Sequence, residues 1–117
     1  MGIIFIDGIV SNKGIEREAR FLVDGGATYS LLKKEVWEYL GLEPMRKMEF
    51  ILADGTKLNR EVSECFMRFP FGSGHSPVIL GEEGDDENLL GAVTLEILGL
   101  VLDPFKRELR PARMLLI

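Results

Sequence analysis

The sequence has few of the features that mark disulfide-stabilised, membrane-spanning or nucleic-acid-binding proteins. It contains one cysteine, Cys65, which excludes an internal disulfide and favours a reducing compartment. No apolar run approaches the roughly 20 residues of a membrane-spanning helix. The N-terminus lacks the charged region, apolar stretch and cleavage site of a secretory signal. The formal net charge is −5, whereas nucleic-acid-binding domains usually present a basic face. We therefore expect a cytoplasmic protein without a membrane or nucleic-acid partner.

Residues for nucleophilic catalysis by serine or cysteine are also scarce. His75 is the only histidine, and it lies far in sequence from Cys65 and from any Ser-based motif. A Ser-His-Asp or Cys-His arrangement therefore has little support. Cys65 stands in the middle of an expected strand, where a small buried apolar role is more common than a reactive thiol.

Two glycine-containing segments could bind ligands, but both have a simpler interpretation. Gly72-x-Gly74 lacks the Lys-Ser/Thr pair and the following helix of a phosphate loop. The segment Gly81–Glu87 is rich in acids, yet its spacing is not that of an EF-hand, so a solvated acidic loop is favoured over a calcium site. We expect neither a cofactor nor a bound metal.

Length and patterning predict one mainly β domain over residues 1–117. Apolar residues make up 46% of the chain and charged residues 28%, which suits a modest core. Strands are expected at 2–10, 15–23, 47–53, 57–69 and 77–80, a glycine-rich turn at 70–76, a strand ending at 89–90, and extended segments at 100–104 and 108–117.

Only two windows have a helical pattern. Ser30 is suited to cap a short helix that runs through Leu40 and ends at Gly41, and the second helix is expected at 92–98, ended by Gly99. Trp37 and Tyr39 in the first helix could stack on a ligand, but a core or half-buried packing role is the more usual one.

The most informative stretch is 21–32, which reads F-L-V-D-G-G-A-T-Y-S-L-L. Three apolar residues run directly into Asp24, and a carboxylate at the end of a buried strand must be compensated by hydrogen bonds or by sharing a proton. Gly25 and Gly26 allow a sharp turn and leave room beside the acid. Two interpretations remain open, an ordinary Asp-Gly turn and a catalytic aspartate on a tight loop.

The order of these elements resembles that of the retropepsin family, the small dimeric aspartic proteases of retroviral type. Asp24–Ala27 stands where that family has Asp-Thr/Ser-Gly-Ala, and Leu89–Gly91 stands where two apolar residues and a glycine precede the family's C-terminal helix. Between them, the Asp-Gly tip of the expected hairpin, Ala53–Thr56, falls where the family has its flap. The resemblance implies a closed, barrel-like acid protease fold with one short C-terminal helix.

The resemblance also implies roles for individual residues. Asp24 is the expected catalytic residue, and the expected substrate-binding residues are those of the loop and of the flap tip: Gly26, Ala27, Ala53, Asp54 and Gly55. Gly25 departs from the family pattern, because the usual Thr or Ser hydroxyl forms a hydrogen bond across the dimer that Gly25 cannot make.

Peptide hydrolysis by carboxylates requires a second acid, because two carboxylates that share one proton serve as base and acid. Asp7, Asp54 and Asp103 do not repeat the context of Asp24, so the second carboxylate is expected to be Asp24 of another copy in an isologous dimer. The sequence thus predicts a homodimeric aspartic endopeptidase acting on peptides or proteins. The alternatives are a retropepsin-like peptide-binding or dimerisation module that Gly25 has rendered weak or inactive, and an unrelated small β protein.

The chain ends are unusually apolar. Ile3, Ile4 and the segment 115–117 are more apolar than free ends, which usually fray into water. In the family, terminal strands of the two chains interleave into one sheet. We therefore expect residues 1–4 and 114–117 to lie at or near the subunit interface.

Overall fold

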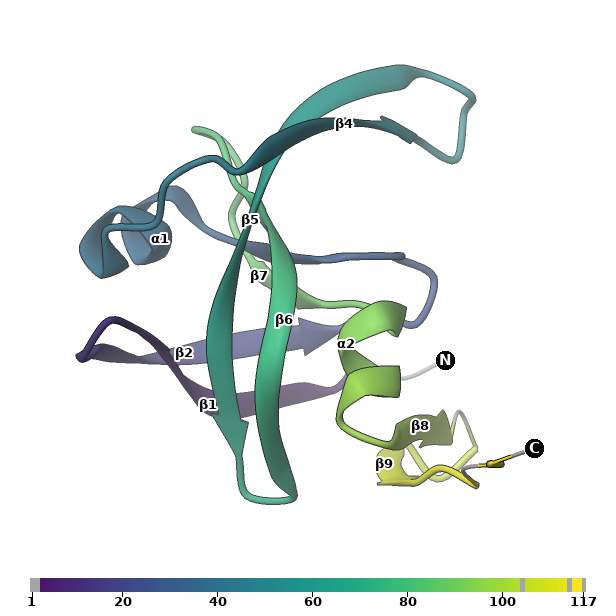
Figure 1. The fold of residues 1–117 in the computed structure, drawn as a ribbon. Helices are drawn as coiled ribbons and strands as arrows, with labels where there is room; N and C mark the ends of the chain where they lie inside the picture. The colour runs from purple at the N-terminus through teal and green to yellow at the C-terminus, as the bar shows by residue number, and fades with distance from the viewer. Residues whose placement is uncertain (1–2, 104, 114, 117) are drawn as a thin grey trace.

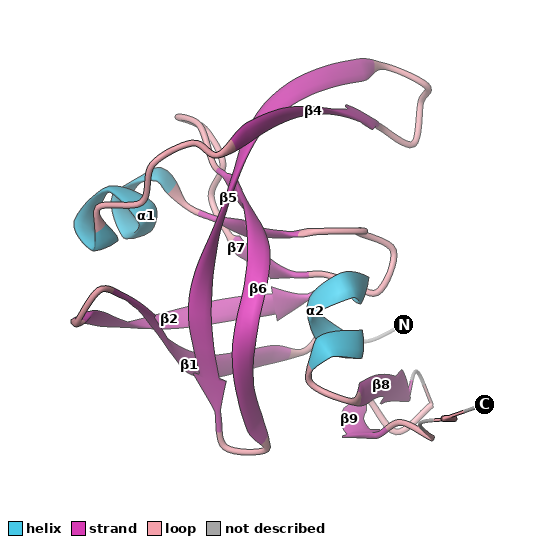
Figure 2. Ribbon diagram, viewed as in Figure 1, coloured by secondary structure: helices cyan, strands magenta, loops and turns pink. Residues whose placement is uncertain are grey.

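The computed structural model describes residues 3–103, 105–113 and 115–116, which form nine strands and two short helices (Figures 1 and 2). The strands are β1 (Phe5–Asn12), β2 (Ile15–Val23), β3 (Ser30–Leu32), β4 (Arg46–Ile51), β5 (Lys57–Phe69), β6 (Gly72–Leu80), β7 (Asn88–Leu90), β8 (Leu100–Asp103) and β9 (Glu108–Pro111). The helices are α1 (Lys34–Leu40) and α2 (Ala92–Ile97).

Six of the strands close into a barrel. They pair in the order β1-β2-β7-β3-β6-β5, and β5 returns to β1 through the pairs from Ile9↔Arg68 to Ser11↔Phe66. Strand β4 extends the sheet beyond this ring by pairing with β5, while β8 and β9 form a separate two-stranded sheet. The expected mainly β, barrel-like fold with a short C-terminal helix is confirmed.

The barrel interior is filled by alternating strand residues, as a pleated sheet requires. Cys65, Met67 and Phe69 all face inward from β5, as predicted. Phe69 meets Phe21 of β2 edge to face, with ring centroids 5.5 Å apart. This packing connects the strand that leads to Asp24 with β5, which lies on the other side of β1 in the barrel.

Strand β7 lies between β2 and β3, although β2 and β3 are consecutive in sequence. It runs parallel to β2, with Val23 opposite Leu90, and antiparallel to β3, with Leu31 opposite Leu89. The chain from 24 to 29 must therefore cross over the end of β7 to connect β2 with β3. Figure 1 shows this crossing loop, α2 and the β8–β9 sheet on one side of the barrel, the side toward which the tip of the β4–β5 hairpin also projects.

The first predicted helix is present as α1, but its predicted start at Ser30 was wrong. Residues 30–32 form β3, which pairs with β6 and β7, and α1 begins only after Lys33. The Ser30 side chain is fully buried and bonds the Thr94 hydroxyl instead of capping a helix. The end of α1 is as expected, because Gly41 adopts a φ of 70°.

The prediction of a long turn at 70–76 was also wrong. Strand β6 begins at Gly72 and pairs with β5 without interruption, from Phe69↔Gly72 to Val62↔Ile79. Glycine-rich sequence weakens a strand but does not prevent pairing with a regular partner.

Other boundaries differ by a few residues. Strand β1 begins at Phe5 and extends to Asn12, because the tight turn needs only Lys13 and Gly14, both at positive φ. Helix α2 ends at Ile97, followed by Gly99 at a φ of 71° as expected. Strand β9 covers 108–111 of the extended segment expected to reach 117. Residues 1, 2, 104, 114 and 117 lie outside the described residues.

The two aromatic residues of α1 behave differently. Trp37 packs against the core and donates its indole N–H to the Gly81 carbonyl at 2.8 Å, so its expected packing role is confirmed. The same expectation for Tyr39 was wrong, because its side chain is 56% exposed and lies beneath the Arg17 guanidinium. Neither helix in the described part of the chain is long and apolar enough to cross a membrane.

The burial of Cys65 leads to a prediction about its reactivity. Burial raises the pKa of the thiol to about 12, with a smaller contribution from the Glu64 charge. At pH 8 only about one thiol in ten thousand is then ionised, against roughly a quarter at an ordinary cysteine pKa. We expect labelling by a thiol reagent at pH 8 to be at least about 100-fold slower in the folded protein than in denaturant. Equal rates would contradict the buried position.

Candidate active site

Asp24 lies at the carboxyl end of β2, where the crossing loop begins. Its amide donates to the Leu90 carbonyl at 3.0 Å, which continues the β2–β7 pairing by one residue. Its carbonyl accepts the Ala27 amide at 3.1 Å, and its Oδ1 accepts the Gly26 amide at 3.0 Å. The carboxylate is therefore held by a tight turn. Its side chain remains partly exposed, so it is accessible to a ligand.

The first turn of α2 holds the far side of the same loop. The amide of Ala92 donates to the Ala27 carbonyl at 2.8 Å, and that of Val93 donates to the Thr28 carbonyl at 2.9 Å. The first amides of a helix have no partner within the helix. Here the loop supplies two of those partners, so helix and loop fix one another.

Gly91 permits this close approach. A Cβ placed there would lie 2.6 Å from both the carbonyl carbon and the oxygen of Tyr29 and 2.9 Å from the Ala27 oxygen. These are backbone atoms of the crossing loop, so they cannot move aside as a flexible side chain would. The glycine predicted before the C-terminal helix thus has a definite steric role.

Gly25 has no such constraint. Its backbone lies outside the positive-φ region. The nearest neighbour of an added Cβ would be the Leu102 Cδ2, at 3.9 Å, an ordinary van der Waals contact. The loop therefore has room for a side chain at the position where the sequence departs from the family pattern.

The β4–β5 hairpin contacts the crossing loop through one face. Arg46 and Phe50 lie on the same face of β4, and both contact Tyr29. The Arg46 Nη2 donates to the Tyr29 hydroxyl at 3.1 Å. The Phe50 and Tyr29 rings lie edge to face, with centroids 5.7 Å apart. Met48 stands between them on the same face and is half-buried. Sequence reasoning missed this cluster, although an aromatic residue five positions after Asp24 and the alternation along β4 were available signals.

The tip of the hairpin has the predicted Asp-Gly turn. The Leu52 amide donates to the Thr56 carbonyl at 2.8 Å, and Gly55 takes a φ of 89°. Asp54 accepts the Thr56 amide at 2.8 Å, and hydrogen bonds from the Thr56 side chain and backbone hold the pKa of its carboxyl below the usual value. Ala53, Asp54 and Gly55 are exposed, with no hydrogen bond to Asp24. Their expected substrate contacts therefore stay a prediction.

The other candidate carboxylates have different roles. The Asp103 Oδ1 accepts the amides of Phe105 and Lys106 and closes the β8–β9 turn, while Asp7 is exposed on β1. Among the described residues, no hydrogen bond joins Asp24 to a second carboxylate. One chain thus supplies one carboxylate in this setting.

The acidic segment 81–87 is occupied by its own contacts. The Asp85 Oδ2 accepts the Glu82 amide at 2.7 Å and the Arg60 Nη1 at 2.9 Å. Within residues 3–103, 105–113 and 115–116, no three His, Cys, Asp or Glu side chains are grouped as metal ligands.

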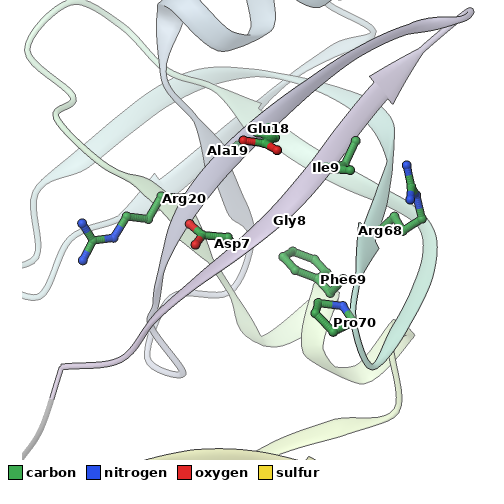
Figure 3. Close-up of a pocket in the computed structure, with 9 residues that line it drawn as sticks. All are labelled: Asp7, Gly8, Ile9, Glu18, Ala19, Arg20, Arg68, Phe69 and Pro70. Atoms are coloured by element: carbon green, nitrogen blue, oxygen red, sulfur yellow. The ribbon is translucent and has the colours of Figure 1, made fainter.

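A separate depression of about 640 Å³ lies on the outer wall between the β1–β2 hairpin and the end of β5 (Figure 3). Asp7, Arg20, Arg68 and Phe69 are among its lining residues, and none of the expected loop or hairpin-tip binding residues lines it. It is distinct from the surroundings of Asp24.

A closed β barrel with an Asp-Gly loop braced by a C-terminal helix is the architecture of the retropepsin-like aspartic proteases. The chain belongs to the aspartyl protease family, whose model matches residues 7–92 and so includes Asp24, the β4–β5 hairpin and Gly91. No curated protein sequence gave a match.

Solved structures share this fold. A retropepsin-like aspartic protease from Rickettsia conorii is 22% identical, with a TM-score of 0.61 over 87% of this chain and 77% of that one. The simian foamy virus protease is 17% identical, with a TM-score of 0.58 over 81% and 94% of the two chains. The EIAV protease, solved with the inhibitor HBY-793, is 16% identical, with a TM-score of 0.60 over 98% and 94%.

The steric role of Gly91 is tested by comparing Gly91→Ala with Gly25→Ala. We expect Gly91→Ala to lower the free energy of unfolding by about 1–3 kcal/mol, the usual cost of forcing extra volume into a packed site. Gly25→Ala should change it by less than about 1 kcal/mol, because the added methyl makes only an ordinary van der Waals contact with Leu102. Urea denaturation of both variants measures the difference, and equal stabilities would contradict the close approach.

Proposed function

We propose that this chain is an aspartic endopeptidase whose active site is completed by a second copy of itself. The observation that carries the proposal is Asp24: a partly exposed carboxylate on a loop fixed by α2, with no hydrogen bond to a second carboxylate among the described residues. Because one chain supplies only one carboxylate in this fixed setting, the second carboxylate of the catalytic pair comes from Asp24 of a symmetric partner.

Exposed apolar side chains support such a partner. Ile3, Phe105, Leu115 and Leu116 are 73%, 96%, 75% and 98% exposed, and water would be displaced from them in a dimer. Val101 of β8 is also exposed, and it precedes Leu102, whose Cδ2 would lie 3.9 Å from a Cβ added at Gly25. The sequence-based prediction places residues 1–4 and 114–117 at or near the subunit interface, and of these residues 1, 2, 114 and 117 lie outside the described residues.

The chemistry follows from two carboxylates that share one proton. The ionised Asp24 takes a proton from a water molecule, whose oxygen attacks the peptide carbonyl carbon. The protonated Asp24 of the other copy donates its proton to the carbonyl oxygen, which gives a neutral tetrahedral diol. The Asp24 that took the water proton now gives it to the peptide nitrogen, while the other Asp24 takes a proton back from a diol hydroxyl, and cleavage of the C–N bond releases a carboxylic acid and an amine. Neither a metal nor a covalent intermediate takes part.

The β4–β5 hairpin serves as the flap in this proposal. An extended peptide would lie between the hairpin and the crossing loop and add backbone hydrogen bonds as a strand does. Gly26, Ala27 and the tip residues Ala53, Asp54 and Gly55 are the proposed contacts. Tyr29 joins flap and loop through Arg46 at the base of the hairpin and through Phe50 nearer its tip.

We also propose a cytoplasmic location. The sequence has a single cysteine, Cys65, and proteins with few cysteines are typical of reducing compartments.

A second candidate function is favoured by Gly25. Without a hydroxyl at this position the two loops of a dimer lack a hydrogen bond between them. The chain would then be a peptide-binding or dimerisation module with weak or no turnover.

The proposal is tested with purified protein and a mixed peptide library at acid to neutral pH. We expect cleavage that is inhibited by pepstatin and that falls by at least about 1,000-fold in Asp24→Asn, because the variant cannot act as the base. Sedimentation should show a dimer for both proteins, since the carboxylate does not form the apolar contact. A monomeric active protein would refute the shared site, and a dimer without cleavage would establish the second candidate.

Gly25→Thr distinguishes a weakened enzyme from one that functions with glycine. Restricting the unfolded backbone favours the variant by about 0.4–1 kcal/mol, and a hydroxyl bond between subunits would add about 0.5–1.5 kcal/mol per bond. We expect a tighter dimer and higher activity. The matched control is Gly25→Val, which has the branched shape without the hydroxyl and should gain only the backbone contribution. Destabilisation by both variants would show that the loop differs from the family's backbone.

A further inference from the structure

Three buried hydroxyl groups connect α2 to the barrel wall behind the crossing loop. Ser30 of β3, Thr94 of α2 and Ser76 of β6 are 0%, 1% and 2% exposed. The Ser30 and Thr94 oxygens lie 2.5 Å apart, and the Thr94 and Ser76 oxygens 2.7 Å apart. A run of three buried hydroxyls is costly unless each one is fully bonded.

A hydroxyl has only one proton to donate, so the donor of one bond in this run fixes the donors of the others. The Ser76 hydroxyl donates to the Pro77 carbonyl at 3.1 Å. Thr94 must therefore donate to Ser76, and Ser30 must donate to Thr94. Ser30 in turn accepts the Gly91 amide at 3.0 Å. The chain of bonds runs one way, from the Gly91 amide through Ser30, Thr94 and Ser76 to a carbonyl of β6.

We propose that this hydroxyl chain positions the catalytic loop, and that Ser30, Thr94 and Ser76 are positioning residues for Asp24. The proposal rests on the proposed peptidase function. Its first step is that the chain holds Gly91 and the first turn of α2 in one place relative to β3 and β6.

The second step is the contact between α2 and the loop. Gly91 touches the backbone of Tyr29, and the next two amides, of Ala92 and Val93, donate to the Ala27 and Thr28 carbonyls. A shift of the helix start therefore changes the loop that carries Asp24. None of the three hydroxyls bonds to the Asp24 carboxylate itself, so they act through the helix.

Removing any one hydroxyl breaks the whole sequence of donors and acceptors. In Ser76→Ala, the Thr94 proton loses its acceptor, and the strengthening that each bond receives from the next is lost along the run. This change is far along the run from Asp24 and alters the volume by a single oxygen. Its effect on catalysis therefore reports on positioning rather than on contact with the substrate.

The experiment compares Ser76→Ala and Thr94→Val with Thr94→Ser, which retains a donor and an acceptor. The matched control is Ser63→Ala, because Ser63 is also buried, at 5% exposure, but lies on β5 outside the hydroxyl run.

For Ser76→Ala we expect kcat to fall at least about tenfold with KM changed less than about twofold, since misalignment of reacting groups lowers turnover more than binding. Thr94→Ser should stay within about threefold of the unaltered protein. Ser63→Ala should match the unaltered protein.

A second readout does not depend on activity. Amide hydrogen exchange should become at least about tenfold faster at Ala92 and Val93 in Ser76→Ala, with the strands β1 and β2 unchanged, because only the helix start is loosened. If the unaltered protein cleaves no peptide, the proposed function fails and the exchange rates alone decide on the hydroxyl chain. Unchanged exchange at both amides would overturn the positioning role. Faster exchange throughout the barrel would also overturn it, since that pattern indicates general destabilisation. If Thr94→Val does not fold, Ser76→Ala gives the same decision.

Discussion

The structure depends on two hydrogen bonds from the start of α2 to the carbonyls of Ala27 and Thr28. Helix α2 has only six residues, too few to be stable without tertiary contacts. The loop from Asp24 has two glycines and would be mobile without external partners. The helix supplies hydrogen-bond donors that fix the loop, and the loop supplies acceptors for the first amides of the helix. This mutual bracing requires β7 to lie between β2 and β3, because only that placement delivers Gly91 to the inner side of the loop.

Much of this arrangement was predictable, because it depends on local sequence. An apolar run ending in Asp-Gly-Gly-Ala marks a strand and a tight turn, Asp54-Gly55 marks a hairpin, and Leu89–Gly91 followed by an apolar window marks the second helix. The relation between these segments came from their joint order rather than from any single motif. That order indicated the aspartyl protease family, although the three solved structures described above are only 16–22% identical to this chain.

The errors share one physical cause, which is that tertiary pairing overrides local preference. Ser30 has the chemistry of a helix cap, but its hydroxyl lies in the core and bonds Thr94, a residue 64 positions away. Gly72 and Gly74 predict a turn, yet β5 offers a long regular edge that they join. The sequence around Tyr29 contains no motif that indicates its role, because its partners Arg46 and Phe50 become its neighbours only when the hairpin folds over the loop.

Strand β5 has a mechanical consequence. Its 13 residues are unbroken, so one strand closes the barrel against β1 at one end and carries the hairpin tip at the other. At Val62 the strand changes partners, since this residue faces both Ile79 of β6 and Arg46 of β4. The part of β5 that forms the β4–β5 hairpin is thus continuous with the part that forms the barrel wall. No loop separates the two parts at Val62. We therefore expect any bending of the hairpin to spread over several residues of β5 rather than to concentrate at one.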